Sequence, residues 1–324
     1  MKIQKFRRVT GVMGALMASA VALAACGGSD GSAATGSKGS VASSVDLSGV
    51  SISVGSKEYP EQLILGQILV QALQGAGATV KDKTGLSGTN VARKALDTGE
   101  TDVYYEYTGT AWLTILGETK PIDDAQGLFD AVRAADKKKG ISWFARAPFN
   151  NTYAVGATAD TAKRTGVTSL SEYAELARNN PEEAKLCSSA EFRTRDDGLP
   201  GLEKHYGFTQ PKGSVFAAEQ PVVYEAADKG KCNFLNLVST DSRIPKEGIV
   251  VLEDDKSFFP VYNPAVSMRS KVYAAHKKQY DELFDPISKL LTQKTILKLN
   301  GAVELDGLPA DKVALDFLKK NKIL

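Results

Sequence analysis

The fold class follows from residues 50–77, VSISVGSKEYPEQLILGQILVQALQGAG. The first five residues alternate apolar and small polar side chains, which is the pattern of a strand. After a short loop, Pro60 stands where a first helical residue is favoured, and apolar residues then recur at helical spacing until Gly75 and Gly77. The segment therefore predicts a strand, a loop and a helix.

The same unit recurs along the chain. We expect further strands near residues 79–83, 101–105, 141–144, 153–155, 186, 215, 233–238 and 249–252. Helical patterns lie between them, at 91–96, 124–139, 170–178 and 222–229, and residues 271–324 are nearly all helix-forming. Alternation of this kind favours an α/β fold with a mainly parallel sheet.

Residues 1–25 have the pattern of a signal peptide. Basic residues up to Arg8 precede an apolar stretch at 9–23, which is short for a permanent membrane span. The stretch ends in Leu-Ala-Ala-Cys26, which resembles the bacterial lipobox, where the chain is cut before the cysteine and its thiol is lipidated. We expect an extracytoplasmic protein anchored to the cell membrane through Cys26. The alternative is an ordinary secreted protein with a chance cysteine at that position.

Residues 26–49 are interpreted as a flexible tether. Residues 27–44 are mainly Gly, Ser and Ala, and such a composition cannot bury a core. Random-coil scaling gives residues 26–50 a reach of roughly 25–30 Å.

The charge balance and the missing motifs exclude several classes of function. The net charge is +2, and it falls to −2 without the four basic residues of the signal peptide, so nucleic-acid binding is not expected. The chain has no Cys-x-x-Cys, His-x-x-x-His, Walker-type loop or Gly-x-Ser-x-Gly, and we interpret His205 and His276 as surface residues. We expect no metal, no cofactor and no catalytic residue. A secreted hydrolase is the least favoured alternative.

Cys187 and Cys232 are the other two cysteines. Outside the cytoplasm, two thiols left after lipidation suggest one disulfide, which would stabilise the fold by about 4 kcal/mol in the loop-entropy model. Two buried free thiols are the alternative, because a sequence does not show proximity.

Tyrosines lie at the ends of predicted strands, where an open α/β sheet binds its ligands. Tyr107, Tyr153 and Tyr262 stand in three separated loops and could form a box for a cation, each ring face contributing about 1–2 kcal/mol. Ordinary core packing is the alternative explanation of these aromatic residues.

Several motifs together resemble one family. In chain order they are GSKEYPEQ (55–62), DVYYEYTGT (102–110), NTY (151–153), EFRTRDDG (191–198), STD (239–241) and FPVY (259–262). This set resembles the substrate-binding lipoproteins of ABC importers for the osmoprotectants glycine betaine, carnitine and choline. The resemblance covers about residues 50–324. It implies a two-lobe type II periplasmic binding-protein fold, a small quaternary amine as ligand, and a membrane permease as partner.

The resemblance also implies residue roles. Tyr107, Tyr153 and Tyr262 fall on positions that surround the quaternary ammonium. Positions that hold the ligand's carboxylate or line the cleft are occupied here by Lys57, Gln62, Thr110 and Arg195. An arginine suits a carboxylate because its planar fork donates two charge-assisted hydrogen bonds. Arg193 is the competing arginine, which we interpret as a surface group.

Val238 departs from the family pattern, because many relatives have an aromatic residue there that helps to close the cage. Tyr59 or Trp112 could compensate. The departure keeps two alternatives open: a binding protein for a different small amine or amino-acid-like solute, and a surface lipoprotein that does not transport.

The resemblance places lobe one at residues 50–151 plus 257–324 and lobe two at 152–256. The chain then crosses between the lobes near Asn151 and near Phe258, and two crossing segments permit hinge closure over a ligand.

Overall fold

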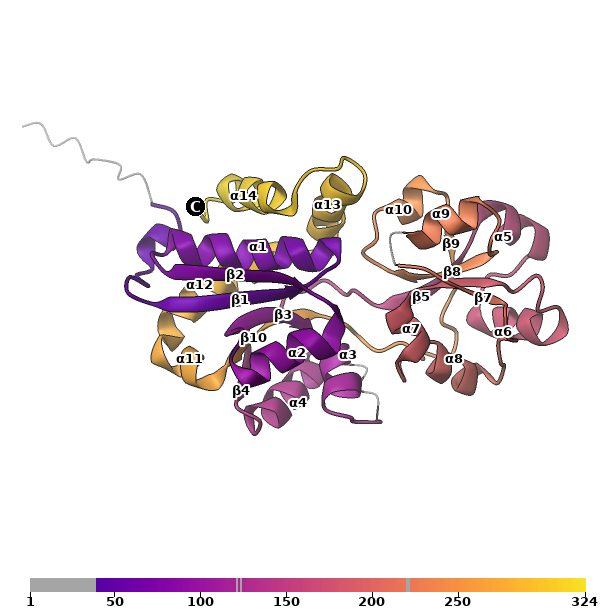
Figure 1. The fold of residues 1–324 in the computed structure, drawn as a ribbon, viewed down its shortest axis with the longest axis horizontal. Helices are drawn as coiled ribbons and strands as arrows, with labels where there is room; N and C mark the ends of the chain where they lie inside the picture. The colour runs from indigo at the N-terminus through magenta and orange to yellow at the C-terminus, as the bar shows by residue number, and fades with distance from the viewer. Residues whose placement is uncertain (1–38, 121, 123, 220–221) are drawn as a thin grey trace, which may run out of the picture. The chain divides into compact units, whose positions relative to one another are not determined.

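The structure is a computed structural model that describes residues 39–120, 122, 124–219 and 222–324. The predictions for the signal peptide, for Cys26 and for residues 26–38 of the tether lie outside the described residues. Two five-stranded sheets, each covered by helices, form two lobes (Figure 1).

Lobe one is built on a sheet with the strand order β2-β1-β3-β10-β4. Its strands are β1 (Ser51–Lys57), β2 (Thr79–Leu86), β3 (Val103–Tyr107), β4 (Ile141–Phe144) and β10 (Pro264–Arg269). Its helices are α1 (Pro60–Gly75), α2 (Gly88–Thr98), α3 (Thr108–Thr110), α4 (Ala125–Lys137), α11 (Ser270–Ala275), α12 (Lys277–Leu290), α13 (Gln293–Glu304) and α14 (Ala310–Lys320), and a π-helical turn, Ala111–Ile115, follows α3.

Lobe two is built on a sheet with the strand order β7-β6-β8-β5-β9. Its strands are β5 (Tyr153–Ala157), β6 (Leu186–Ser188), β7 (Val215–Ala217), β8 (Phe234–Val238) and β9 (Val250–Val251). Its helices are α5 (Ala159–Thr165), α6 (Leu170–Asn179), α7 (Ala190–Thr194), α8 (Leu199–Tyr206), α9 (Val222–Asp228) and α10 (Arg243–Lys246).

Each sheet is mainly parallel, as expected, but contains one antiparallel strand, which the sequence did not predict. β1 pairs in parallel with β2 and β3, but β10 lies antiparallel between β3 and β4. In lobe two, β5 likewise runs antiparallel to β8 and β9. The reason is the chain path: β5 enters lobe two and β10 re-enters lobe one, and each inserts into the sheet of the lobe that it reaches.

Helix α1 forms where the apolar stripe predicted it and is buried on more than one face. Pro60 occupies its first turn, where a missing N–H costs nothing. Leu65, Ile68 and Leu69 are fully buried, because α1 packs on β1 and β2 and also against α14 (Figure 1). The packing of α1 fixes the end of β1 and the short loop after it, which place Lys57 and Tyr59 at the end of the sheet.

Two crossing segments join the lobes, one between β4 and β5 and the other between β9 and β10. They run side by side: Asn151 N–H donates to the Tyr262 carbonyl at 3.0 Å, and Tyr262 N–H donates to Asn150 Oδ1 at 2.8 Å. Short segments of this kind can act as a hinge because a few residues can absorb the change in backbone angles.

The described part of the predicted tether, residues 39–49, does not behave as a tether throughout. Ala42, Val45 and Leu47 are buried in the core of lobe one. Ala42 N–H donates to the Ile323 carbonyl at 2.9 Å, and Leu47 N–H donates to the Ala76 carbonyl at 2.8 Å. The composition of residues 39–49 did not predict this packing, because the three apolar residues that hold the segment are spaced among small and polar residues.

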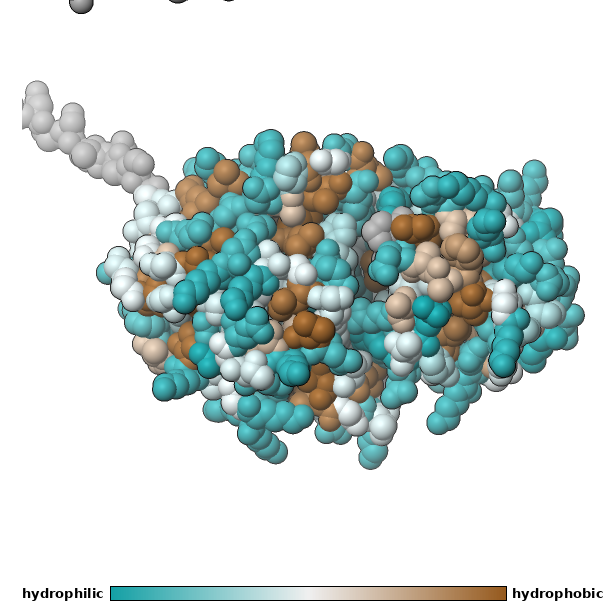
Figure 2. Space-filling view, in the orientation of Figure 1, coloured by the Kyte–Doolittle hydropathy of each residue, from teal (hydrophilic) through white to brown (hydrophobic). Residues whose placement is uncertain are grey.

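Cys187 and Cys232 form a disulfide within lobe two, with an S–S distance of 2.00 Å. It links β6 to the segment before β8 and does not restrict the crossings. On the face shown in Figure 2, hydrophilic side chains cover much of both lobes, as expected when the apolar ones are packed inside. Among the described residues, none of the helices is both long and apolar enough to span a membrane.

Candidate functional site

A cavity of about 710 Å³ opens at the ends of the strands where the lobes meet. Its walls come from both lobes and from the crossings. They include the predicted site residues Lys57, Tyr107, Thr110, Tyr153, Arg195, Val238 and Tyr262. The structure therefore brings together residues that are far apart in the sequence, in the crevice where α/β sheets bind ligands.

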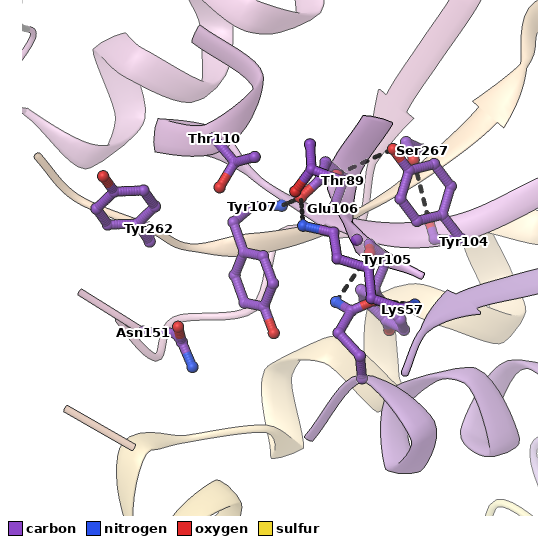
Figure 3. A network of polar contacts seen from close by, with 12 residues as sticks. Lys57, Thr89, Tyr104, Tyr105, Glu106, Tyr107, Thr110, Asn151, Tyr262 and Ser267 are labelled. Atoms are coloured by element: carbon purple, nitrogen blue, oxygen red, sulfur yellow. Dashed lines mark hydrogen bonds and ion pairs between the residues drawn. The ribbon is translucent and has the colours of Figure 1, made fainter. Parts of the chain in front are cut away.

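Three tyrosines surround one part of this cavity. Tyr107 is the last residue of β3, Tyr153 the first of β5, and Tyr262 lies in the second crossing. The rings of Tyr153 and Tyr262 meet edge to face with centroids 5.7 Å apart. Tyr107, Tyr262 and Asn151, labelled in Figure 3, all line this cavity. Rings from separate segments that face a common space can hold a cation between their faces.

Gly109 allows one of these rings to come close. A Cβ placed on Gly109 would lie 2.8 Å from two carbons of the Tyr262 ring and 2.9 Å from the Val261 carbonyl oxygen. Any larger residue would therefore push Tyr262 away. The sequence motif YTGT contained this glycine, but the sequence did not show what it approached.

The tyrosine hydroxyls donate to buried carboxylates behind the cavity wall. Tyr107 donates to Glu61 Oε1 at 2.7 Å, and Tyr262 donates to Asp197 Oδ2 at 2.6 Å. Burial raises the pKa of both phenols well above the usual value, and the adjacent carboxylates raise it further. Both tyrosines therefore stay neutral and keep their rings available to a ligand.

Glu61 is the centre of a polar network at the hinge. It accepts from Asn151 Nδ2 at 2.8 Å and from Asn300 Nδ2 at 2.9 Å, in addition to Tyr107. Asn151 also donates to Thr240 Oγ1 of lobe two at 2.6 Å. Burial raises the pKa of Glu61, and these donors oppose the shift. The network joins the cage to both lobes.

Arg195 lies in the cavity wall with its guanidinium already engaged. Nε donates to Asp197 Oδ1 at 2.6 Å and Nη2 to Asp197 Oδ2, which makes a bidentate pair. Nη1 donates to Glu191 at 3.1 Å, and Nη2 also donates to Thr110 Oγ1 at 3.3 Å. Four of its five N–H groups are thus used. The fork expected for a ligand carboxylate is occupied by the protein's own carboxylate.

Lys57 is likewise paired. Its ammonium contacts Glu106 Oε1 at 2.8 Å and lies 5.3 Å from the centroid of the Tyr107 ring (Figure 3). Gln62, in contrast, lies behind the cavity wall: it accepts from Lys57 N–H at 3.2 Å and donates to the Tyr105 carbonyl at 3.0 Å. Gln62 was expected in the cleft, but it supports Lys57 from beneath, because helix α1 turns this side chain toward β3.

The remaining residues considered in the sequence analysis differ in whether they line the cavity. Val238 lines the cavity beside Tyr153, its partner in the β5–β8 pairing. Tyr59 lines it too, whereas Trp112 donates its indole N–H to the Lys120 carbonyl and lies in another apolar cluster. Arg193 is half-buried and its Nε has no hydrogen-bond partner, so it is not the exposed surface group that we expected.

Sequence reasoning did not assign Glu61, Asp197 or Asn151. All three lie inside the quoted motifs, so their membership of these motifs could have identified them as site residues. Their roles depend on partners 46, 65 and 89 residues away. Within the described residues, no group of three or more His, Cys, Asp or Glu side chains could hold a metal ion.

A cavity between two lobes, joined by two crossing segments, defines a two-lobe solute-binding protein. The family model described as the substrate binding domain of an ABC-type glycine betaine transport system matches residues 50–320. The chain belongs to this family, which serves transport and is not a family of enzymes.

Individual proteins agree with this assignment. The glycine-betaine-binding protein of Pseudomonas aeruginosa is 33% identical over 276 residues, which cover 84% of this chain and 88% of that protein. The structure of apo YehZ from Escherichia coli is 31% identical with a TM-score of 0.60, covering 84% of this chain and 99% of that one. A glycine betaine/carnitine/choline ABC transporter structure is 25% identical with a TM-score of 0.66, at 84% and 99% coverage.

Proposed function

We propose that this protein binds a quaternary-ammonium solute, glycine betaine or a similar compound, in the cavity between its lobes. The observation that carries the proposal is the meeting of Tyr107, Tyr153 and Tyr262 around one space from lobe one, lobe two and a crossing. A quaternary ammonium has no N–H to donate, so aromatic faces are the partners that suit it. The family to which the chain belongs supports the same solute class.

The bound form delivers the solute to the membrane permease of an ABC importer. Contacts from both lobes stabilise closure about the paired crossings, and the closed form docks on the permease. The protein works outside the cytoplasm, held to the membrane by a lipid on Cys26. The Cys187–Cys232 bridge supports this location, because such bonds persist in oxidising compartments.

Calorimetric titration of the purified chain tests the proposal. The ligands are glycine betaine, choline and carnitine, with dimethylglycine and glycine as compounds that have fewer methyl groups. We expect saturable binding that weakens as methyl groups are removed.

Tyr153→Ala should abolish detectable binding or weaken it at least tenfold. Tyr206→Ala is the matched control, because Tyr206 is a buried tyrosine of lobe two that does not line the cavity. Folded protein that gives no heat with any of these ligands contradicts the proposal.

Val238 favours a second candidate, a protein for a bulkier or different small amine. Val238 lines the cavity opposite Tyr153 with an aliphatic side chain, where an aromatic residue would add a further ring face. Binding of a larger betaine with no measurable binding of glycine betaine would support this candidate.

A further inference from the structure

The rings that face the cavity are backed by buried carboxyl groups. Glu61 and Asp197 accept the hydroxyl hydrogens of Tyr107 and Tyr262, and these carboxylates are only 3% and 2% exposed. A phenol that donates to a carboxylate has a more electron-rich ring. The carboxylate also adds its own attraction for a cation, which is strong where water is excluded. Both effects strengthen the hold on a positively charged group.

The positive groups of the wall are neutralised before any ligand arrives. Asp197 occupies the fork of Arg195, and Glu106 holds the ammonium of Lys57. A ligand carboxylate could reach Arg195 only by competing with Asp197, which is buried and which also holds Tyr262. Breaking that pair costs more than an exposed one, because it would leave a buried charge without its partner.

The remaining charge of the wall is negative. The two cations of the wall, Lys57 and Arg195, are each balanced by a buried carboxylate. The wall has three further carboxylates, those of Glu58, Glu191 and Glu219. Burial raises the pKa of Glu191, but Lys57 and Arg195 outweigh this and hold the pKa below its usual value. Glu191 is therefore ionised at neutral pH. It also accepts from Thr89 of lobe one at 2.6 Å, so it lies where the lobes close.

We propose that the cavity selects a quaternary amine of net charge +1, with a hydroxyl or other neutral tail, over a zwitterion that carries a carboxylate. Asp197 and Glu61 are the specificity-determining residues, Asp197 by occupying Arg195 and both by accepting the hydroxyls of the cage tyrosines. This inference rests on the proposed function, of which it names the ligand charge class.

The test compares choline and glycine betaine by calorimetric titration of the purified chain at one pH and ionic strength. Both carry the same trimethylammonium group and differ in the tail. We expect choline to bind at least tenfold more tightly. Equal affinity, or tighter binding of glycine betaine, overturns the inference and leaves the proposed function standing. No binding of either compound overturns both.

Two variants then test the assigned residues. Asp197→Asn should free Arg195 and shift the choline-to-betaine affinity ratio at least tenfold toward glycine betaine. Glu61→Gln keeps the shape of the side chain and should weaken choline about three- to tenfold, with a smaller effect on glycine betaine. If Asp197→Asn does not fold, Glu61→Gln still tests the assignment.

Asp281→Asn is the matched control. Asp281 is a carboxylate of lobe one that accepts the hydroxyl of Tyr273 and does not line the cavity. Its substitution should leave the affinity ratio unchanged. A ratio that moves equally in the control, or that does not move in either test variant, overturns the assignment of Asp197 and Glu61.

Discussion

At the scale of single residues, Val238 and Tyr153 show how one position shapes the cavity. They face each other across β8 and β5, so their side chains share one face of the sheet at close range. Tyr153 also packs edge to face on Phe192, with centroids 5.1 Å apart, which fixes its ring. The wall next to a fixed aromatic ring is therefore formed by an aliphatic side chain.

Replacing Val238 by Trp should tighten binding of choline about three- to tenfold. The added ring face contributes about 1 kcal/mol of attraction for the cation, and the cavity has room for it. Titration calorimetry measures the effect. Val250→Trp is the control, because Val250 is an exposed valine of the same sheet that does not line the cavity. Weaker binding in Val238→Trp would mean that the ligand itself fills the space beside Tyr153.

At the scale of secondary-structure elements, the segment at residues 41–47 completes lobe one. It hydrogen-bonds to residues 322 and 323 beside the C-terminus and to Ala76 after helix α1. Gly75 reflects this close packing: a Cβ there would lie 2.2 Å from Leu324 and 3.2 Å from Ala42. The two ends of the described chain thus close over α1, and residues 39–324 form one compact unit.

Removing residues 1–49 should lower the free energy of unfolding by roughly 3–5 kcal/mol relative to removing residues 1–38. The longer deletion takes away the buried side chains of Ala42, Val45 and Leu47 and exposes the surface beneath them. Urea denaturation of the two proteins measures the difference. Ligand affinity should be equal in both, because no residue of the segment lines the cavity. Coincident denaturation curves would restore the tether interpretation for residues 39–49.

At the scale of the whole described chain, the lobes are joined at the crossings, at the cavity rim and at the end of helix α13. The crossings join them covalently, and the cavity rim joins them through Thr89 and Glu191. A third contact runs from Glu304 at the end of α13 to Ser242 after β8, where the serine hydroxyl donates to Oε2 at 2.6 Å. Burial, and then repulsion from Asp241, raise the pKa of Glu304 to about 7.

This contact should make stability depend on pH. The pKa of Glu304 is higher in the folded than in the unfolded protein, so the folded state binds the proton more tightly. Protonated Glu304 stabilises the folded state fully below about pH 4.5. This stabilisation is lost as the pH rises to about 7, which lowers the free energy of unfolding by up to about 3 kcal/mol.

Denaturation from pH 4.5 to 7.5 measures this contribution as the difference between the wild type and Glu304→Gln, which cannot titrate. The wild type should lose stability relative to the variant across that range. Glu100→Gln, at an exposed carboxylate of lobe one, should follow the wild type. If the free energies of unfolding of the wild type and Glu304→Gln change equally with pH, Glu304 is not the group whose titration alters stability.

Much of the fold and part of the site could be predicted from the sequence. The strand–loop–helix of residues 50–77 and the amphipathic helix α4 depend on side-chain periodicity within one turn or one strand. Tyr107, Tyr153 and Tyr262 were predicted from their places at strand ends and in the family motifs. Gln62 shows the limit, because the same motif that carries Lys57 into the cavity wall turns Gln62 away from it.

The α/β class, the family and the three tyrosines can be predicted from the chain of residues alone, because they depend on neighbouring residues or on motifs in order. The antiparallel direction of β10, the packing of residues 41–47 and the contacts of Asp197 with Arg195 and Tyr262 are visible only in the folded molecule. Tyr262 and Asp197 lie 65 residues apart, and Glu61 and Asn300 lie 239 apart. Local periodicity carries no information about such pairs. Their contact depends on two lobes folding and meeting, and that meeting sets the charge of the cavity.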